Sequence, residues 1–302
     1  MRYYFFGDIH GNTPALERCL AHIDARGPDA VHCLGDIVGW LPSGDETVKR
    51  MKALGLPTVA GNHDLMVGGL FRDHPHQLDR MQATAYNAGI LAALPECVDY
   101  LMELPLLLEF KDFTVVHHSP FHLPPKGVAP DIGCFGYLDE KLMREVLAQW
   151  RDYPKRLIFS GHDHDPAVYE LPDAADPPRL EDVIAHRPPR TGSIAVRISQ
   201  DARYWVKAGS VGGPYRDETP VANSVLYDDA AGVVELFRLE YPTGELRNRL
   251  ASNRFFGGIP TMQSYLRVLD AATGPGHSGS RDSRTRTNSD TARLLLKSLA
   301  DG

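Results

Sequence analysis

The sequence predicts an α/β fold built on a parallel sheet, and two observations carry this prediction. Apolar, strand-like segments at 2–6, 30–34 and 57–60 alternate with segments whose apolar residues recur at helical spacing. This alternation is typical of parallel strands joined by right-handed crossovers. Each strand-like segment also ends in glycine and polar residues, at the carboxyl ends where open α/β sheets place their sites.

The helices between these strands have recognisable starts. We expect Thr13 to cap the first helix, with Pro14 at its first position, and a second helix to cover about 46–54. Residues 65–105 contain no clear strand pattern, and 77–94 has helical spacing, so this stretch is predicted to be a helical insertion. It either packs against the domain or forms a lid that shapes a substrate pocket.

A second group of elements follows the insertion. Segments 106–110 and 113–116 flank a Lys-Asp pair and are typical of a hairpin. A proline-rich loop covers 119–136, and apolar residues at four-residue spacing predict a helix from about 138 to 150. A further strand is expected at 156–160.

The C-terminal part is predicted to add a second sheet. Residues 172–191 have the composition of an exposed loop, and strands are expected at 194–198, 204–206, 223–227 and 233–239. The domain is expected to span 1–272. Residues 273–302 are predicted to be a flexible tail rich in Gly, Ser, Arg and Thr, with a short helix at 292–300.

Composition and charge narrow the class of protein. The formal net charge of −7 argues against duplex nucleic acid as a partner, because such binders usually carry a basic stripe. Cys19, Cys33, Cys97 and Cys134 form no CxxC pair and are expected to be free thiols. The chain lacks the pattern of a secretory signal or a membrane span, so a cytoplasmic location is expected.

Potential metal ligands stand at the ends of the predicted strands. A single Gly-Asp pair is usually only a turn, and a lone histidine on a strand usually packs. Here, however, strand after strand ends in nitrogen or oxygen donors. These residues are Asp8, His10, Asp36, Asn62, His63, His117, His162 and His164.

Five stretches carry a family resemblance: Gly7-Asp8-Ile9-His10-Gly11, Gly35-Asp36, Gly61-Asn62-His63-Asp64, Val116-His117 and Gly161-His162-Asp163-His164. In order and spacing the chain resembles the calcineurin-like metallophosphoesterase superfamily over about 2–165. A sixth stretch, 208–214, is similar to a segment of the bacterial and archaeal phosphodiesterase-like branch. The resemblance implies a four-layer α/β/β/α sandwich with a helical insertion near the active site.

The resemblance also implies a dinuclear metal centre. Asp8, His10, Asp36 and His164 would hold one divalent metal, and Asp36, Asn62, His117 and His162 would hold the other. Asp36 would then bridge the two ions. Mixed imidazole and oxygen donors suit Mn, Fe, Zn, Co or Ni. His117 is favoured over His118 as the ligand because it is in line with the preceding strand.

The implied reaction is hydrolysis of a small phosphomonoester or phosphodiester, including nucleotide-type esters. A metal-bridging hydroxide would attack phosphorus, and the two cations would neutralise charge. His63, beside the expected ligand Asn62, is not needed for the metals and can act as general acid for the leaving group, or it packs behind the ligands. His118, Arg216, His122 and Lys126 are weaker candidates for contact with the substrate.

Departures from the family pattern bear on the substrate. Where protein phosphatases of the superfamily have a second Asp and an Arg, this chain has Gly39 and Trp40. This argues against a protein Ser/Thr phosphatase or a symmetrical diadenosine-tetraphosphatase; Trp40 would pack or stack on a base. Lys207 and Ala208 replace an expected Asn-Pro, which we regard as a minor change, and the following turn is expected to be structural. A non-catalytic metal-binding scaffold remains the competing class.

Overall fold

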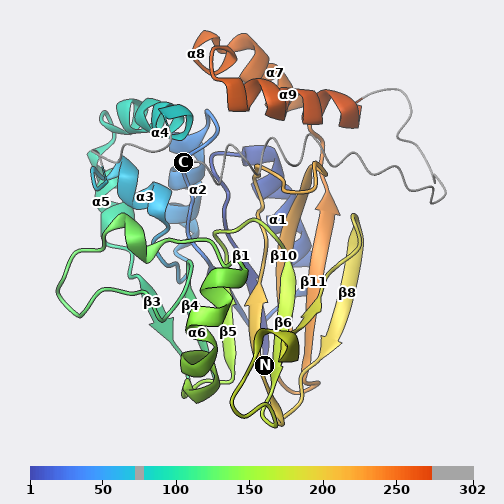
Figure 1. The fold of residues 1–302 in the computed structure, drawn as a ribbon. Coiled ribbons are helices and arrows are strands. Elements are labelled where there is room, and N and C mark those ends of the chain that lie inside the picture. The colour runs from blue at the N-terminus through green and yellow to red at the C-terminus, as the bar shows by residue number, and fades with distance from the viewer. Residues whose placement is uncertain (72–77, 274–302) are drawn as a thin grey trace.

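The computed structural model describes residues 1–71 and 78–273, and it has four layers: helices, sheet, sheet and helix (Figure 1). The five-stranded sheet has the order β2 (Ala30–Cys33), β1 (Arg2–Phe6), β10 (Val221–Asp228), β11 (Val233–Glu240) and β8 (Gly192–Arg197). The six-stranded sheet has the order β3 (Leu107–Glu109), β4 (Phe113–Val116), β5 (Leu157–Ser160), β9 (Ala202–Lys207), β6 (Ala167–Pro172) and β7 (Ile184–His186). The predicted four-layer α/β/β/α sandwich is therefore confirmed.

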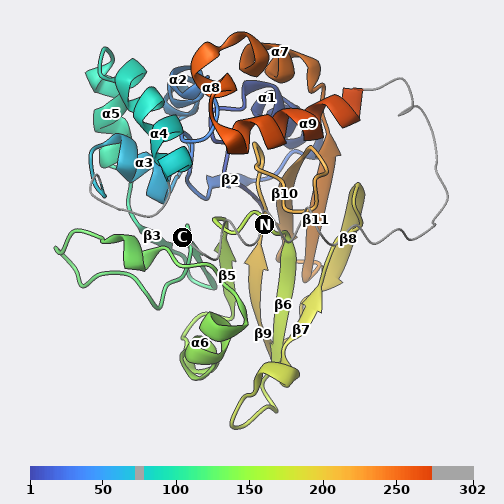
Figure 2. The ribbon, with the colours of Figure 1, turned by 45° about the horizontal axis from the view of Figure 1, so that its top comes forward.

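Helices cover the outer face of each sheet. Over the five-stranded sheet lie α1 (Thr13–Arg26), α2 (Gly44–Leu54), α3 (Asn62–Val67), α4 (Leu78–Leu91), α5 (Pro95–Met102), α7 (Gly244–Ser252), α8 (Arg254–Gly257) and α9 (Pro260–Thr273), most of which share one apolar cluster with it. Helix α6 (Glu140–Asp152) packs on the six-stranded sheet through its buried face. Figure 2 shows α2, α4 and α5 gathered beside α7 and α8.

Apolar clusters on both faces of β1 bury its successive residues Tyr4, Phe5 and Phe6. Tyr4 and Phe6 belong to the cluster under the helices, whereas Phe5 faces the other sheet. Both faces of the strand are covered at these three residues, so they are hydrophobic in succession rather than alternating with polar residues. Between the sheets the ring of Phe5 stacks on that of Phe159, with centroids 3.8 Å apart.

The strand pairing corrects several sequence expectations. Both sheets are mixed rather than parallel, since β1 pairs parallel with β2 but antiparallel with β10. The C-terminal strands are divided between the sheets: β8, β10 and β11 extend the first, and β9 joins β5 in the second. Such pairings are long-range and leave no local signature in the sequence.

Other differences are local. Segment 57–60 makes a single β-bridge, Cys33 to Thr58, because it is short and begins with a proline that has no N–H to donate. The loop predicted at 172–191 contains β7. Asn12, not Thr13, caps α1, since its Oδ1 accepts the Ala15 N–H at 3.1 Å.

Several expectations hold. The hairpin of β3 and β4 is antiparallel, with Leu107 opposite Val116, and 65–105 contains helices and no strand in its described residues. The four cysteines are free and buried. Residues 274–302, which include the predicted tail and terminal helix, lie outside the described residues. Within 1–71 and 78–273, no helix has the length and apolar character needed to cross a membrane.

Candidate metal centre

The loops that follow the strands carry their donor residues in an uncommon backbone conformation. Asp8, His10 and Asp36 each have φ of 52°, His162 has 69° and His164 has 58°. Non-glycine residues rarely adopt this left-handed region, and such outliers persist where the surrounding structure enforces them. Here they turn carboxylates and imidazoles from separate strand ends toward one place.

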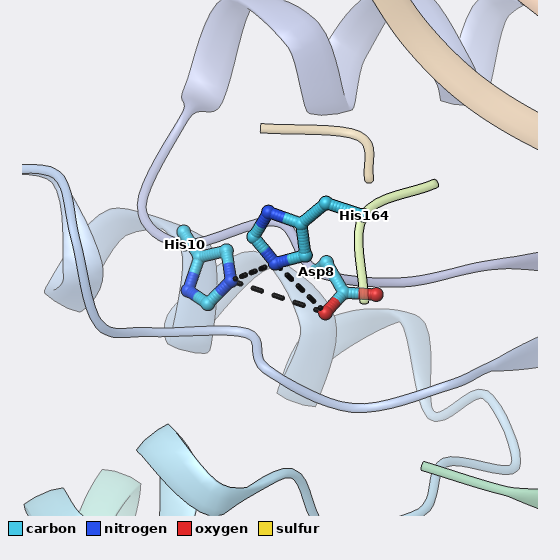
Figure 3. Close-up of side chains that lie close together, drawn as sticks. All are labelled: Asp8, His10 and His164. Carbon is cyan, nitrogen blue, oxygen red and sulfur yellow. Dashed lines mark hydrogen bonds and ion pairs between the residues drawn. The ribbon is translucent and has the colours of Figure 1, made fainter. Parts of the chain in front are cut away.

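Asp8, His10 and His164 form the first group of donors (Figure 3). His164 Nε2 lies 3.2 Å from Asp8 Oδ1 and 3.0 Å from His10 Nε2. Asp8 comes from the end of β1, and His164 follows β5, so the tertiary fold brings together residues far apart in the chain.

Asp36, His117 and His162 form a second group, and Asn62 adjoins it. His117 Nε2 lies 3.3 Å from Asp36 Oδ2, 3.2 Å from Asn62 Oδ1 and 3.2 Å from His162 Nδ1. Asp36 Oδ2 also lies 3.6 Å from His10 Nε2. The Asp36 carboxylate therefore faces both groups.

Backbone carbonyls fix the orientation of three of these imidazoles. His10 Nδ1 lies 3.1 Å from the Val38 oxygen, His117 Nδ1 2.6 Å from the Leu34 oxygen, and His164 Nδ1 2.9 Å from the Pro214 oxygen. Each Nδ1–H can thus donate to a carbonyl, which leaves the Nε2 lone pair directed into the cluster.

This arrangement fits divalent cations. With both Nδ1–H groups donated to carbonyls, the Nε2 lone pairs of His10 and His164 meet at 3.0 Å, a repulsive contact unless a metal ion or a proton lies between them. Two nitrogens bound at about 2.1 Å to one cation, at a right angle, stand about 3 Å apart. Buried carboxylates beside them supply compensating charge, and the donor types suit transition metals.

The pKa values of the clustered residues bear on which of them could ligate a metal. Burial by itself raises the pKa of Asp36, but the neighbouring His117 and His63 hold that pKa well below its usual range. Burial disfavours the charged form of His117, yet the Asp36 carboxylate raises its pKa to about 9. Burial lowers the pKa values of His10 and His162. The ionised Asp36 carboxylate and the neutral imidazoles of His10 and His162 are in the states that ligate a metal, whereas His117 would have to lose the proton that Asp36 stabilises before it could ligate one.

Asp64 organises the Asp36 loop, a role that the sequence did not reveal. Its carboxylate accepts the N–H groups of Asp36 at 2.8 Å, Ile37 at 2.9 Å, Val38 at 3.2 Å and Gly61 at 3.0 Å. Burial, followed by the charge of Asp36, raises the pKa of Asp64 to about 7. A signal was available, because Asp64 stands at the third helical position after Gly61, where a carboxylate can reach back to amides.

The backbone of the turn at 208–214 donates hydrogen bonds to the loop that carries Asp8. Val211 N–H donates to the Gly7 oxygen at 3.0 Å, and Gly212 N–H donates to the Asp8 oxygen at 2.9 Å. A Cβ on Gly212 would lie 1.8 Å from the Ile9 oxygen, so only glycine fits there. The small residues of this turn thus allow two backbones to approach closely.

His63 lies beside the cluster, on α3. Its ring is edge-on to that of His10, with centroids 5.0 Å apart, and its Nδ1 lies 3.2 Å from Thr84 Oγ1 of α4. Trp40, 4% exposed, packs with its ring centroid 5.9 Å from that of His63. Helix α4 of the insertion thus reaches the site, and Thr84 is a neighbour that the sequence analysis missed because a helical threonine carries no signal of its own.

The weaker candidates for substrate contact are spread around the cluster. Arg216 is half-buried, its Nε donates to the Asp163 oxygen at 2.8 Å, and its guanidinium lies 5.0 Å from the centre of the Tyr137 ring. Tyr137 in turn stacks on His162. A cavity of about 200 Å³ lies beside His164 and is lined by Arg187, Arg216, Arg238, Asp165 and Asp217, among others. Arg216 therefore lies between the cluster and the cavity.

His118 is buried, and neither of its ring nitrogens has a hydrogen-bond partner among the described residues. His122 is half-buried and contacts Ser119 Oγ at 3.0 Å, while Lys126 is exposed. The Lys207 replacement is not minor: this side chain is 2% exposed and forms an ion pair with Asp163, next to His162. Burial, followed by the charge of Arg216, lowers the pKa of Lys207.

The fold and the clustered donors define a metal-site protein of the two-sheet sandwich class. The family model for calcineurin-like phosphoesterase matches residues 1–166, more than half of the chain. The chain therefore belongs to the calcineurin-like phosphoesterase family, as the sequence resemblance predicted. Membership indicates a phosphoesterase, which is a hydrolase, and the family uses divalent metals.

Individual relatives agree with this membership. An uncharacterized protein of Methanocaldococcus jannaschii is 30% identical over 251 residues, which cover 82% of this chain and 90% of that protein. The crystal structure of a metallophosphoesterase from Sphaerobacter thermophilus is 30% identical, with a TM-score of 0.68 and coverage of 89% of this chain and 98% of that one.

A symmetrical bis(5'-nucleosyl)-tetraphosphatase of Shewanella sp. (strain ANA-3) is 33% identical over 123 residues. That match covers 38% of this chain and 43% of the tetraphosphatase, so it spans less than half of the relative's length.

Proposed function

We propose that this protein is a dinuclear-metal-dependent phosphoesterase that hydrolyses small phosphomonoesters or phosphodiesters. One divalent cation would be held by Asp8, His10, Asp36 and His164, and the other by Asp36, Asn62, His117 and His162; Mn, Fe, Zn, Co and Ni suit these donors. The supporting observation is the Asp36 carboxylate, whose Oδ2 lies 3.6 Å from His10 Nε2 and 3.3 Å from His117 Nε2. One carboxylate facing two donor groups is what a bridged pair of cations requires.

Bound cations would supply Lewis-acid activation of water and would neutralise charge on the phosphoester. The chain's own residues supply the rest. His63, buried beside His10, donates a proton to the leaving oxygen as the oxygen–phosphorus bond breaks. Arg216, at the rim between the cluster and the cavity, pairs with anionic groups of the substrate. His118, whose ring centroid lies 5.2 Å from that of His162, and His122, whose ring centroid lies 5.9 Å from that of His118, are further candidates for contact with the substrate.

The substrate class is inferred from charge. Of the three arginines that line the cavity beside His164, Arg187 and Arg238 form ion pairs with Asp165 and Asp217, and Arg216 donates to the Asp163 carbonyl. The chain as a whole has a net charge of −7, and Arg216 beside the cluster suits a small phosphoester better than duplex nucleic acid, whose binders usually carry a basic stripe. Nucleotide-type esters are included because one relative is a bis(5'-nucleosyl)-tetraphosphatase.

The direct test is a phosphoester panel assayed with each candidate metal. The panel contains p-nitrophenyl phosphate, its bis-ester, an alkyl phosphomonoester, nucleotides, diadenosine tetraphosphate and a phosphopeptide. We expect metal-dependent turnover of small esters. Absence of turnover across the panel, with metal bound, would instead support a non-catalytic scaffold, and selective phosphopeptide hydrolysis would support a protein phosphatase.

The role of His63 has its own test. We expect His63→Ala to lower kcat for an alkyl phosphomonoester by about a hundredfold, because an alkoxide needs a proton to leave. Turnover of p-nitrophenyl phosphate should fall far less, since p-nitrophenolate leaves without protonation. Metal content, measured by atomic emission, should stay at the wild-type value; loss of metal would show that His63 acts as a ligand instead.

A further inference from the structure

Helix α4 places the Thr84 hydroxyl against His63 in the protein interior. Thr84 Oγ1 lies 3.2 Å from His63 Nδ1, and the two residues are 2% and 5% exposed. A hydrogen bond shielded from water restricts a side chain more than an exposed one, because water does not compete for either partner. The contact is therefore suited to fixing the orientation of the His63 ring.

The loop beside His63 cannot supply such a contact from position 39. Gly39 has φ of +141°, and a Cβ built on it would lie 2.7 Å from His63 Nδ1 and 2.8 Å from His10 Nδ1. Any side chain at 39 would push against both rings. Position 39 therefore supplies no side chain to the Nδ1 side of His63, and Thr84 of α4 contacts that nitrogen.

A second contact on the same helix face fixes α4 to this loop. Asn87, which lies three residues after Thr84 on the same face, donates through Nδ2 to the Gly39 oxygen at 2.9 Å and to the Leu41 oxygen at 3.1 Å. Asn87 is fully buried. The distance between α4 and the loop at 39–41 is thus set independently of the Thr84 hydroxyl.

We propose that Thr84 is a positioning residue for His63, an inference that rests on the proposed function. In the protonated imidazole both ring nitrogens are donors. Nδ1–H donates to Thr84 Oγ1, which holds the ring, and Nε2–H is the proton that passes to the leaving oxygen. The imidazole is left neutral, with its Nδ1–H still bound to the hydroxyl.

The test compares two substrates with different leaving groups, so that a positioning role of Thr84 can be told from a purely structural one. Thr84→Val keeps the shape but removes the hydroxyl, and Thr84→Ser keeps the hydroxyl. We expect Thr84→Val to lower kcat for the alkyl phosphomonoester about tenfold and kcat for p-nitrophenyl phosphate less than about threefold. KM and metal content should be unchanged, and Thr84→Ser should restore most of the alkyl activity.

Three further variants test this interpretation. Thr114→Val removes another buried hydroxyl, which lies in β4 and is 3.1 Å from Tyr153 Oη, and it should not alter the ratio between the two substrates. Thr84→Ala should show the same selectivity as Thr84→Val if the hydroxyl is what matters. In a His63→Ala background, Thr84→Val should have no further effect on that ratio.

The inference is overturned if Thr84→Val slows both substrates equally, or if Thr84→Ser behaves like Thr84→Val. These outcomes leave the proposed function intact as long as His63→Ala retains its leaving-group selectivity. If His63→Ala itself shows no selectivity, the acid role fails, and the role of Thr84 fails with it.

Discussion

The edge of the sandwich where the strands end and the interior between the two sheets are both buried, but they are built in opposite ways. At the edge, Asp8, His10 and Asp36 hold polar groups at positive φ, with imidazole nitrogens as close as 3.0 Å. In the interior, Phe5 and Phe159 stack at 3.8 Å with their ring planes 9° apart. The first region concentrates unfavourable contacts, and the second removes apolar surface from water.

The difference shows where stability and chemistry reside in this molecule. Left-handed backbone at non-glycine residues and buried polar groups each cost free energy. Hydrophobic burial between the sheets offsets these costs, because folding stability is shared by the whole domain. Substitutions at the edge should therefore act mainly on metal binding and turnover, and substitutions in the interior mainly on unfolding.

The largest expected effect is at the carboxylate that faces both donor groups. Asp36→Asn removes the negative charge beside His10 and His117, so two cations would lose their shared ligand. We expect turnover to fall at least about a thousandfold and bound metal to fall in the same preparation. Added metal should raise the melting temperature of the wild type but not that of the variant.

Asp45→Asn provides the matched control. Asp45 pairs with Lys49 on the surface of α2, 3.4 Å apart, so the loss of its charge should leave metal binding and turnover unchanged. Full metal content in Asp36→Asn would remove this residue from the proposed centre.

The interior should respond in the opposite way. Phe159 is fully buried between the sheets and contacts the rings of Phe5, Phe113 and Tyr227. Phe159→Ala should lower the free energy of unfolding in urea by about 3–5 kcal/mol, because it leaves a cavity. Phe255→Ala, at an exposed ring on α8, should cost less than about 1 kcal/mol. If the two variants cost the same, the inter-sheet core is not the main source of stability.

The two regions also differ in how far the sequence predicts them. The ligand candidates could be predicted because Gly-Asp and Gly-His pairs at strand ends are local, and they recur in the family's order. The division of β8, β9, β10 and β11 between two sheets could not, because each pairs with strands distant in the chain. The helices after β11 were also missed.

Contacts that hold the site were harder to predict than the site itself. Asp64 was visible only as part of a motif, although its carboxylate organises the Asp36 loop. Thr84 reaches His63 only because α4 folds back over the loop at 39–41, where Asn87 fixes it. The helical position of Asp64 indicates a contact with backbone amides, but not that these belong to the distant Asp36 loop. The Thr84 contact follows from neither periodicity nor spacing, since it depends on how α4 packs in three dimensions.

The smallest expected effect, and the most specific test, is at His32, because it is an imidazole placed in the apolar interior. It is 2% exposed, its ring stacks on that of Phe5 at 5.3 Å, and its Nδ1 has no hydrogen-bond partner among the described residues. Burial lowers the pKa of His32 to about 4. Between about pH 6.5 and pH 4 the unfolded chain binds a proton that the folded chain does not, so stability falls as the pH falls through this window.

His32→Leu removes that proton uptake and replaces the polar ring with an apolar side chain. We expect the variant's gain in unfolding free energy over the wild type to be about 2 kcal/mol larger at pH 5 than at pH 7.5. Urea unfolding at the two pH values measures this difference. An equal change at both would mean that His32 titrates alike in the folded and unfolded chains, and that the interior tolerates a charged group as the edge does. A larger gain at pH 5 would assign to the interior a pH dependence that owes nothing to the metal centre.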